Sequence, residues 1–188
     1  MNYFEELTNT RHKKSESMAT DLSSMILQIR KQNIKESLFD IDSIGHRQQY
    51  IANIDDVMYY DDSKAESVNA TWFTFENIID PVVWIAGGKA NHTDFSDLLP
   101  MVKKNVKALI CLGKDNNKLI ETFSDSVAEI FEAHSMDEAV NMANIIAQEG
   151  DIVLFSPACK SDKARENYIE RGNQFTESVN KLENEHHQ

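Results

Sequence analysis

Two groups of residues in the first half of the chain could bind a phosphorylated ligand. His46-Arg47 precedes a run with strand character, and the planar fork of Arg47 could bind an anion or stack on an aromatic ring. Asp62-Ser63-Lys64-Ala65 follows such a run, and its carboxylate, hydroxyl and ammonium could hold ribose and phosphate groups at a helix N-terminus. Both groups also have plain structural explanations, since Arg47 could be a surface residue and Asp62 or Ser63 could cap the helix.

Two further groups follow apolar runs later in the chain. Gly87-Gly88 lets the backbone turn sharply and could bring main-chain N–H groups close to a ligand, although the pair does not form a GxGxxG fingerprint. The segment 156–161 has small polar residues that could contact a ligand carboxylate. It also has Cys159, but the sequence places no histidine beside this thiol. A buried free cysteine is therefore favoured over a nucleophile, as it is for Cys111.

The elements that must position these groups alternate between strands and helices. The apolar run 82–88 is typical of a strand covered on both faces, the central strand of a parallel sheet. Strands are expected at 49–54, 57–61, 106–112, 127–131 and 151–155, and helices at 67–79, 95–104, 116–123, 135–150 and 163–182. Asp55-Asp56 suggests a hairpin between the first two strands. The alternation predicts an α/β fold with a doubly wound, mostly parallel sheet, whose ligands bind at the carboxyl ends of its strands.

The first part of the chain has a different pattern. Apolar residues recur every three or four positions over 15–31, which predicts an amphipathic helix, and a shorter helix is expected at 34–39. We therefore expect a helical arm at 1–43, an α/β domain at 44–183 and a short tail at 184–188.

Composition excludes several classes of function. The formal charge of −12 argues against binding to nucleic acid or to an anionic membrane surface, because phosphate contacts need clustered Lys and Arg. No apolar run is long enough to span a membrane and no signal peptide is visible, so a cytoplasmic location is expected. No HExxH or paired CxxC motif occurs, so no metal site made by this chain alone is expected.

Together, the order and spacing of the four groups resemble the C-terminal domain of the Mur ligases, most closely the branch that adds D-glutamate. The resemblance covers about residues 12–182, and 12–43 is similar to the last helices of the family's central domain. Its matching stretches are His46-Arg47, Asp61–Ala65, Ser67–Trp72, Val83–Gly88, Asp94-Phe95, Gly150–Leu154, Ser156–Cys159 and Glu170–Phe175.

This resemblance implies ATP-dependent amide bond formation in peptidoglycan biosynthesis. ATP would phosphorylate the carboxylate of UDP-N-acetylmuramoyl-L-alanine, and the amine of D-glutamate would attack the acyl phosphate. The family pattern assigns nucleotide contacts to Arg47, Asp62 and Lys64, with Lys64 as the catalytic residue if the chain is active. It assigns binding of the amino-acid substrate to four residues, namely Ser161, Lys89, Asn91 and Tyr168. ATP and Mg²⁺ would be held mainly by a domain that this sequence does not contain.

Several departures from the family pattern bear on activity. Glu66 stands where the family has threonine and would repel an anionic amino acid, and Asn91 stands where the family has lysine, although Lys89 could substitute. Asp162 replaces an apolar residue, and no G-x-x-x-x-G-K-[ST] phosphate loop occurs. One hypothesis is therefore a piece of a D-glutamate-adding ligase, inactive as this chain alone. Another is a stand-alone, non-catalytic relative that acts as a binding or regulatory module, with a complete Mur ligase as its partner. The third is an unrelated α/β protein that binds a small molecule.

Overall fold

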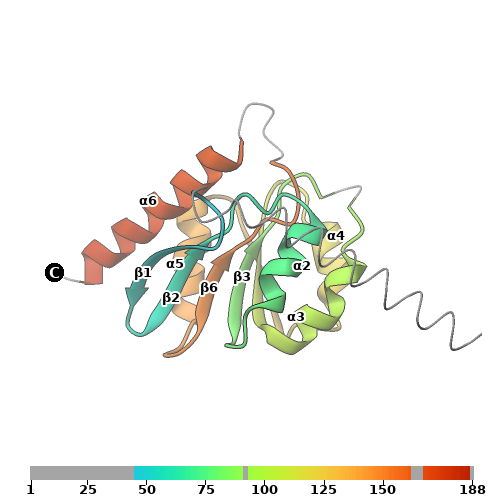
Figure 1. Ribbon diagram of the computed structural model, residues 1–188, viewed down its shortest axis with the longest axis horizontal. Coiled ribbons are helices and arrows are strands. Elements are labelled where there is room, and N and C mark those ends of the chain that lie inside the picture. Colours follow the sequence, from blue (N-terminus) through green and yellow to red (C-terminus); the bar gives the residue numbers. More distant parts are fainter. Residues whose placement is uncertain (1–44, 91–92, 162–166, 187–188) are drawn as a thin grey trace, which may run out of the picture. The chain divides into compact units, whose positions relative to one another are not determined.

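The computed structural model describes residues 45–90, 93–161 and 167–186, which form one sheet with helices on both faces (Figure 1). The helices expected at 15–31 and 34–39 lie outside the described residues, and so does Asn91.

The sheet has six strands in the order β1-β2-β6-β3-β4-β5. Strand β1 pairs antiparallel with β2, and every other pair is parallel. The strands are β1 (Gln49–Ile54), β2 (Val57–Asp61), β3 (Val82–Ala86), β4 (Val106–Leu112), β5 (Glu129–Ala133) and β6 (Ile152–Phe155). This topology confirms the predicted α/β fold with a mostly parallel sheet, and β3 lies in its interior between β6 and β4.

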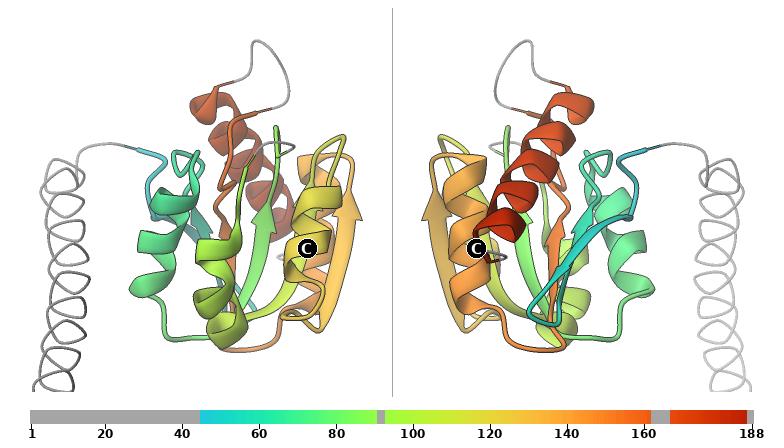
Figure 2. Two further views of the ribbon diagram at one scale, coloured as in Figure 1. Left: turned by 90° about the vertical axis from the view of Figure 1, so that its right-hand side faces the viewer. Right: turned by 90° about the vertical axis from the view of Figure 1, so that its left-hand side faces the viewer.

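Helices cover the two faces of the sheet, as a doubly wound fold requires (Figures 1 and 2). On one face lie α5 (Met136–Ile146) and α6 (Tyr168–His186), and on the other lie α2 (Val68–Glu76), α3 (Leu99–Asn105) and α4 (Asn117–Phe123), with the short 3₁₀ helix η2 (Ser96–Leu98) before α3. None of the helices in the described part of the chain has the length and apolar character to cross a membrane.

Strand β3 divides the core between the two faces. All five of its residues are buried, and alternate side chains point to opposite faces. Val83 and Ile85 pack in the cluster under α5 and α6, whereas Trp84 packs in the cluster under α2 and α4. The Trp84 ring meets Phe75 edge-on, with ring centroids 5.2 Å apart, and its indole N–H donates to the carbonyl of Ser156 at 2.8 Å. This bond fixes the end of β6 against β3, at the edge of the sheet where the candidate residues lie.

The predicted hairpin between β1 and β2 is confirmed. Its two turn residues, Asp55 and Asp56, have φ values of 50° and 60°. Two consecutive left-handed residues are typical of the type I′ turn that joins antiparallel strands closely.

Several predicted boundaries differ from the observed ones. Strand β5 begins at Glu129 instead of Val127, α5 ends at Ile146 instead of Gly150, and α6 runs from Tyr168 to His186 instead of from 163 to 182. Helix α2 ends three residues before Ile79, because the side-chain amide of Asn105 donates to the carbonyls of Phe75 and Ile78 and so binds the end of the helix from outside. A partner 30 positions away in sequence decides this helix end, so local periodicity could not locate it.

Candidate functional site

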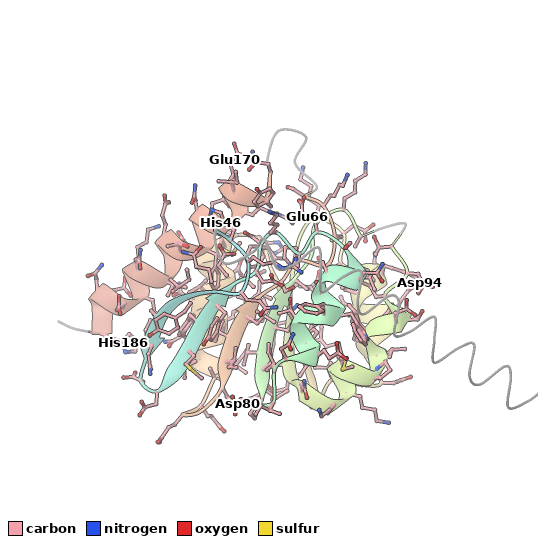
Figure 3. The ribbon with its side chains drawn as sticks, in the orientation of Figure 1. His46, Glu66, Asp80, Asp94, Glu170 and His186 are labelled. Carbon is pink, nitrogen blue, oxygen red and sulfur yellow. The ribbon has the colours of Figure 1, made fainter. Side chains whose placement is uncertain are left out.

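Three connections meet at the carboxyl ends of the parallel strands. They follow β2, β3 and β6, and main-chain hydrogen bonds join them. Ala158 N–H donates to Ala65 O at 2.9 Å, and Lys89 N–H donates to Lys160 O at 2.7 Å. His46 and Glu66 lie along this edge of the molecule, and Asp80 lies at the opposite edge (Figure 3). The groups selected from the sequence thus lie together, as the parallel sheet predicts.

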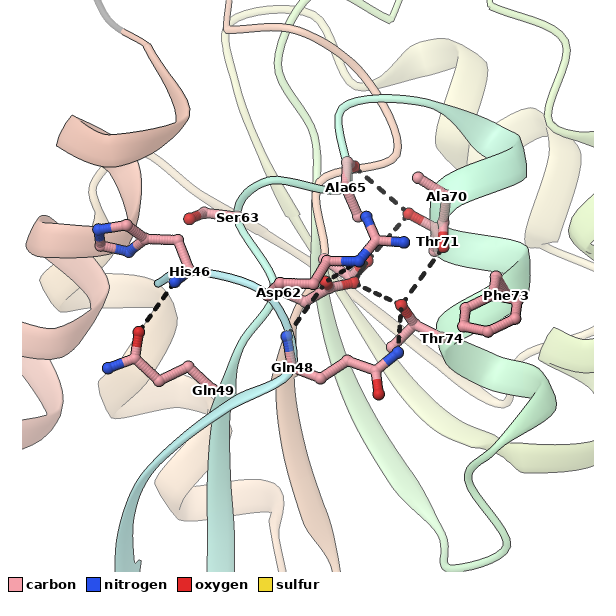
Figure 4. A network of polar contacts seen from close by, with 12 residues as sticks. His46, Gln48, Gln49, Asp62, Ser63, Ala65, Ala70, Thr71, Phe73 and Thr74 are labelled. Carbon is pink, nitrogen blue, oxygen red and sulfur yellow. Dashed lines mark hydrogen bonds and ion pairs between the residues drawn. The ribbon is translucent and has the colours of Figure 1, made fainter. Parts of the chain in front are cut away.

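Asp62 is the centre of a buried polar network (Figure 4). Its Oδ2 accepts hydrogen bonds from Thr74 Oγ1 at 2.6 Å and from Ser156 Oγ at 2.8 Å. Its Oδ1 accepts a long bond of 3.3 Å from Gln48 N–H and lies 3.7 Å from Arg47 Nε. Burial raises the pKa of Asp62 to about 6, although Arg47 and the hydrogen bonds act to lower it.

These contacts give Asp62 a structural role in the present arrangement. Its side chain is fully buried, and the Arg47 side chain is only 9% exposed. The nucleotide contacts expected of these two residues stay predictions. A ribose could reach Asp62 only if Gln48 gave up its bond and the segment around it moved.

Lys64 differs from Asp62, because its charged group is available to a ligand. The main-chain N–H of Lys64 donates to His46 O at 3.1 Å, and His46 Nδ1 lies 2.6 Å from Asp61 Oδ2. The Lys64 ammonium lies 5.5 Å from the centroid of the Tyr168 ring. Within the described part of the chain, no carboxylate lies within ion-pair distance of this ammonium. Lys64 therefore fits an anionic ligand such as a phosphate group.

Arg171, on α6, joins all three connections and was not selected as a site residue from the sequence. Its Nη1 donates to Gly87 O at 3.3 Å, and its Nη2 donates to Cys159 O at 3.1 Å and to Glu66 Oε1 at 2.9 Å. The sequence signal was present, since Arg171 lies in a stretch that resembles the Mur ligases, but its partners are far away along the chain. Glu66 was expected to repel anions, yet its charge is compensated by Arg171.

The glycine turn packs closely against neighbouring main-chain segments, and its expected contact with a ligand stays a prediction. Gly87 and Gly88 have φ values of 134° and 135°, and a Cβ on them would collide with the carbonyls of Leu112 and Lys160 respectively. The N–H groups of Gly87 and Lys89 donate to main-chain carbonyls of the connection after β6. These glycines thus permit close packing of two main-chain segments, and the N–H groups of Gly87 and Lys89 are already bonded.

Three of the four residues expected to bind the amino acid lie in the described part of the chain. Ser161 lines a cavity of about 410 Å³ together with Gly88, Arg171 and residues at the ends of β4 and β5. Lys89 is exposed beside this cavity but does not line it. Tyr168 packs against His46 and Lys64 instead of the cavity lining.

The two cysteines are buried thiols that form no disulfide, as predicted. Burial raises the pKa of the Cys111 thiol to about 12, and the Cys159 thiol donates a hydrogen bond to Pro157 O at 3.4 Å. No cluster of three His, Cys, Asp or Glu side chains suited to a metal ion occurs among residues 45–90, 93–161 and 167–186.

Comparison with known sequences gives matches over most of the chain. Residues 46–159 match a family model described as "Mur ligase, glutamate ligase domain". The UDP-N-acetylmuramoylalanine–D-glutamate ligase of Christiangramia forsetii is 44% identical over 172 residues, which are 92% of this chain and 39% of that protein. The corresponding ligase of Salinibacter ruber is 37% identical over 172 residues, again 92% of this chain, and 37% of that protein. The chain therefore spans about two fifths of the length of the curated relatives it matches.

Comparison with solved structures supports the fold. The MurF ligase of Thermotoga maritima in complex with ADP aligns with a TM-score of 0.51 at 15% identity, over 77% of this chain and 34% of that one. A bifunctional folylpolyglutamate synthase/dihydrofolate synthase of Yersinia pestis, complexed with AMPPNP and Mn ion, aligns with a TM-score of 0.50 at 16% identity, over 76% of this chain and 32% of that one. At these identities the likeness concerns the fold alone.

Proposed function

The chain belongs to the Mur ligase family through its glutamate ligase domain, and we propose that it forms the part of a D-glutamate-adding ligase that binds the amino acid and closes over the nucleotide. The reaction of such a ligase is ATP-dependent amide bond formation in peptidoglycan biosynthesis. The chain covers 39% of its relative from C. forsetii, and the remaining parts of the reaction would be supplied by residues outside these 188.

One observation carries this proposal, namely the ammonium of Lys64 at the edge where three connections meet, which has no carboxylate partner among the described residues. In a protein with a formal charge of −12, such a lysine attracts an anion to one defined place. ATP, when bound, supplies the phosphoryl group that activates the acceptor carboxylate. Lys64 would hold the negative oxygens of the phosphate or of the reacting carboxyl group and stabilise the charge that develops on them.

The cavity beside Arg171 supports a site for a small amino acid. Ser161 on its wall could donate a hydrogen bond to a substrate carboxylate, and Lys89 stands at the neighbouring turn. We propose that these residues orient D-glutamate so that its amine faces the activated carboxyl group.

We further propose that this chain alone does not complete the reaction. The 188 residues contain no G-x-x-x-x-G-K-[ST] loop, so the outer phosphates of ATP and the accompanying Mg²⁺ would be held mainly by other residues. Lys64 and Ser161 would then act by binding and positioning.

A second candidate function is a non-catalytic relative that binds or regulates a complete ligase. The pairing of Glu66 with Arg171 favours this second function. The Glu66 carboxylate already neutralises the Arg171 guanidinium at the edge of the sheet where an acidic amino acid would bind. Under this hypothesis the cavity would bind D-glutamate weakly or not at all.

Titration calorimetry on the 188-residue chain tests the main proposal. Wild type should bind MgATP, and Lys64→Met should weaken that binding about 10- to 100-fold, since a hydrogen bond to a charged group contributes about 1.5–3 kcal/mol. Lys104→Met is a matched control, because Lys104 lies in the last turn of α3, before the amino end of β4. Equal affinities of Lys64→Met and wild type would contradict the nucleotide role. Binding of D-glutamate in preference to L-glutamate would favour the ligase over the second candidate.

A further inference from the structure

The Lys64 ammonium is held in a way that preserves its charge. It lies 5.5 Å from the centroid of the Tyr168 ring, within the range of a cation–π interaction. A carboxylate at this distance would also hold the ammonium but would neutralise it. An aromatic face attracts the cation through its quadrupole and leaves the three N–H donors able to bind an anion.

His46 fixes both partners of this contact. The Tyr168 and His46 rings meet edge-on, with centroids 6.2 Å apart and an interplanar angle of 74°. His46 is anchored in turn by the carboxylate of Asp61, 2.6 Å from its Nδ1. The carbonyl of His46 also accepts the main-chain N–H of Lys64 at 3.1 Å. One residue thus sets the position of the ring and of the lysine backbone.

Gly172 allows α6 to bring Tyr168 to this place. The two residues are four positions apart and therefore lie on the same face of the helix. A Cβ on Gly172 would come within 2.5 Å of Asp61 Oδ2 and of Ser63 Oγ, and it would also collide with His46 Nδ1. A larger residue at this position would therefore require either these side chains or the backbone of α6 to shift.

From these contacts we infer that Tyr168 is a positioning residue for Lys64. Its ring face holds the ammonium at the edge of the sheet without cancelling its charge, and His46, which is anchored by Asp61, contacts the ring edge-on. The direct amino-acid contact expected of Tyr168 from the sequence stays a prediction beside this role. The position of Lys64 follows from the geometry, whereas its use in holding a phosphate rests on the proposed function.

NMR of the lysine side chains in the full chain tests the inference. The ring current of Tyr168 should displace the ε-methylene protons of Lys64 upfield of those of the exposed Lys103 and Lys104, and Lys64→Met should remove the displaced signal and so assign it. Tyr168→Phe should keep the displacement, because it keeps the ring. Tyr168→Leu should abolish it. A wild-type Lys64 signal that coincides with those of Lys103 and Lys104 would overturn the inference, as would a displacement that survives in Tyr168→Leu.

Even if Tyr168→Leu does not fold, the wild-type and Tyr168→Phe spectra show whether Lys64 lies over the ring of residue 168. Addition of MgATP separates this inference from the proposed function. If the displaced Lys64 signal is present and MgATP moves it, the result supports both the positioning role of Tyr168 and the nucleotide role of Lys64. If the signal is present but MgATP leaves it unchanged, the nucleotide role fails while the positioning role of Tyr168 stands.

Discussion

The guanidinium of Arg171 donates a hydrogen bond to the carboxylate of Glu66 across 2.9 Å, and this ion pair joins α6 to the connection after β2. The Arg171 side chain is 5% exposed and that of Glu66 is 27% exposed, so the pair lies at the boundary between the core and the solvent. Since the same guanidinium also binds the carbonyls of Gly87 and Cys159, it couples the three connections that carry the candidate ligand residues.

Replacement of Arg171 by methionine should destabilise the domain by about 3 kcal/mol. The variant keeps the apolar stem but leaves one carboxylate and two carbonyls without their shared donor. Urea denaturation should show a lower midpoint at an unchanged slope. Lys181→Met is the control, because Lys181 is 64% exposed and its pair with the 58% exposed Asp137 should contribute less than about 1 kcal/mol. Equal effects of the two variants would refute a central role for Arg171.

Asp62 should make the stability of the domain depend on pH. Its folded-state pKa of about 6 lies above the ordinary 3.8, so the folded state binds a proton more tightly than the unfolded state does. The resulting stabilisation is fully present below about pH 4 and is lost as the pH rises through 6, by about 3 kcal/mol in total.

Comparison with Asp62→Asn measures this dependence. The amide does not titrate, so only wild type should lose stability through this group. The free energy of unfolding of wild type minus that of the variant should therefore decrease as the pH rises from 4 to 7. Chemical denaturation at each pH provides the measurement. If the free energy of unfolding of wild type minus that of the variant stays constant or increases over this range, the pKa of Asp62 is not raised.

Gly172→Ala should destabilise the domain although alanine favours helices. Helix propensity alone predicts a gain of about 1 kcal/mol, whereas overpacking against the buried Asp61 and Ser63 should cost about 1–3 kcal/mol. The sign of the change in thermal unfolding temperature therefore decides between the two effects. Gly45→Ala is the control, since a Cβ there meets, among the described residues, only Gln49 Oε1 at 3.6 Å and should change stability little. A higher unfolding temperature for Gly172→Ala would mean that α6 does not pack as closely as described.

The sequence predicts the sheet well because its strands carry local signals. The apolar runs that form β2, β3 and β4 are recognisable from their composition. Their carboxyl ends then locate the edge of the sheet at which Lys64 and Ser161 lie. The contacts that define the site are not local. Asp62 meets Ser156 across 94 positions, and Glu66 meets Arg171 across 105 positions. No periodicity links such pairs, so their pairing becomes visible only when the chain is folded.

The double variant Glu66→Thr with Asn91→Lys should create or strengthen binding of D-glutamate. The first change removes a carboxylate that competes for Arg171, and the second adds an ammonium after the glycine turn. One new charge-assisted bond should lower the dissociation constant at least about tenfold, measured by calorimetry with L-glutamate as the stereochemical control. Glu66→Gln with Asn91→Lys separates the charge of residue 66 from its size, because glutamine keeps the length of glutamate. If the folded double variant binds D-glutamate no better than wild type, these two residues do not limit the affinity of the site.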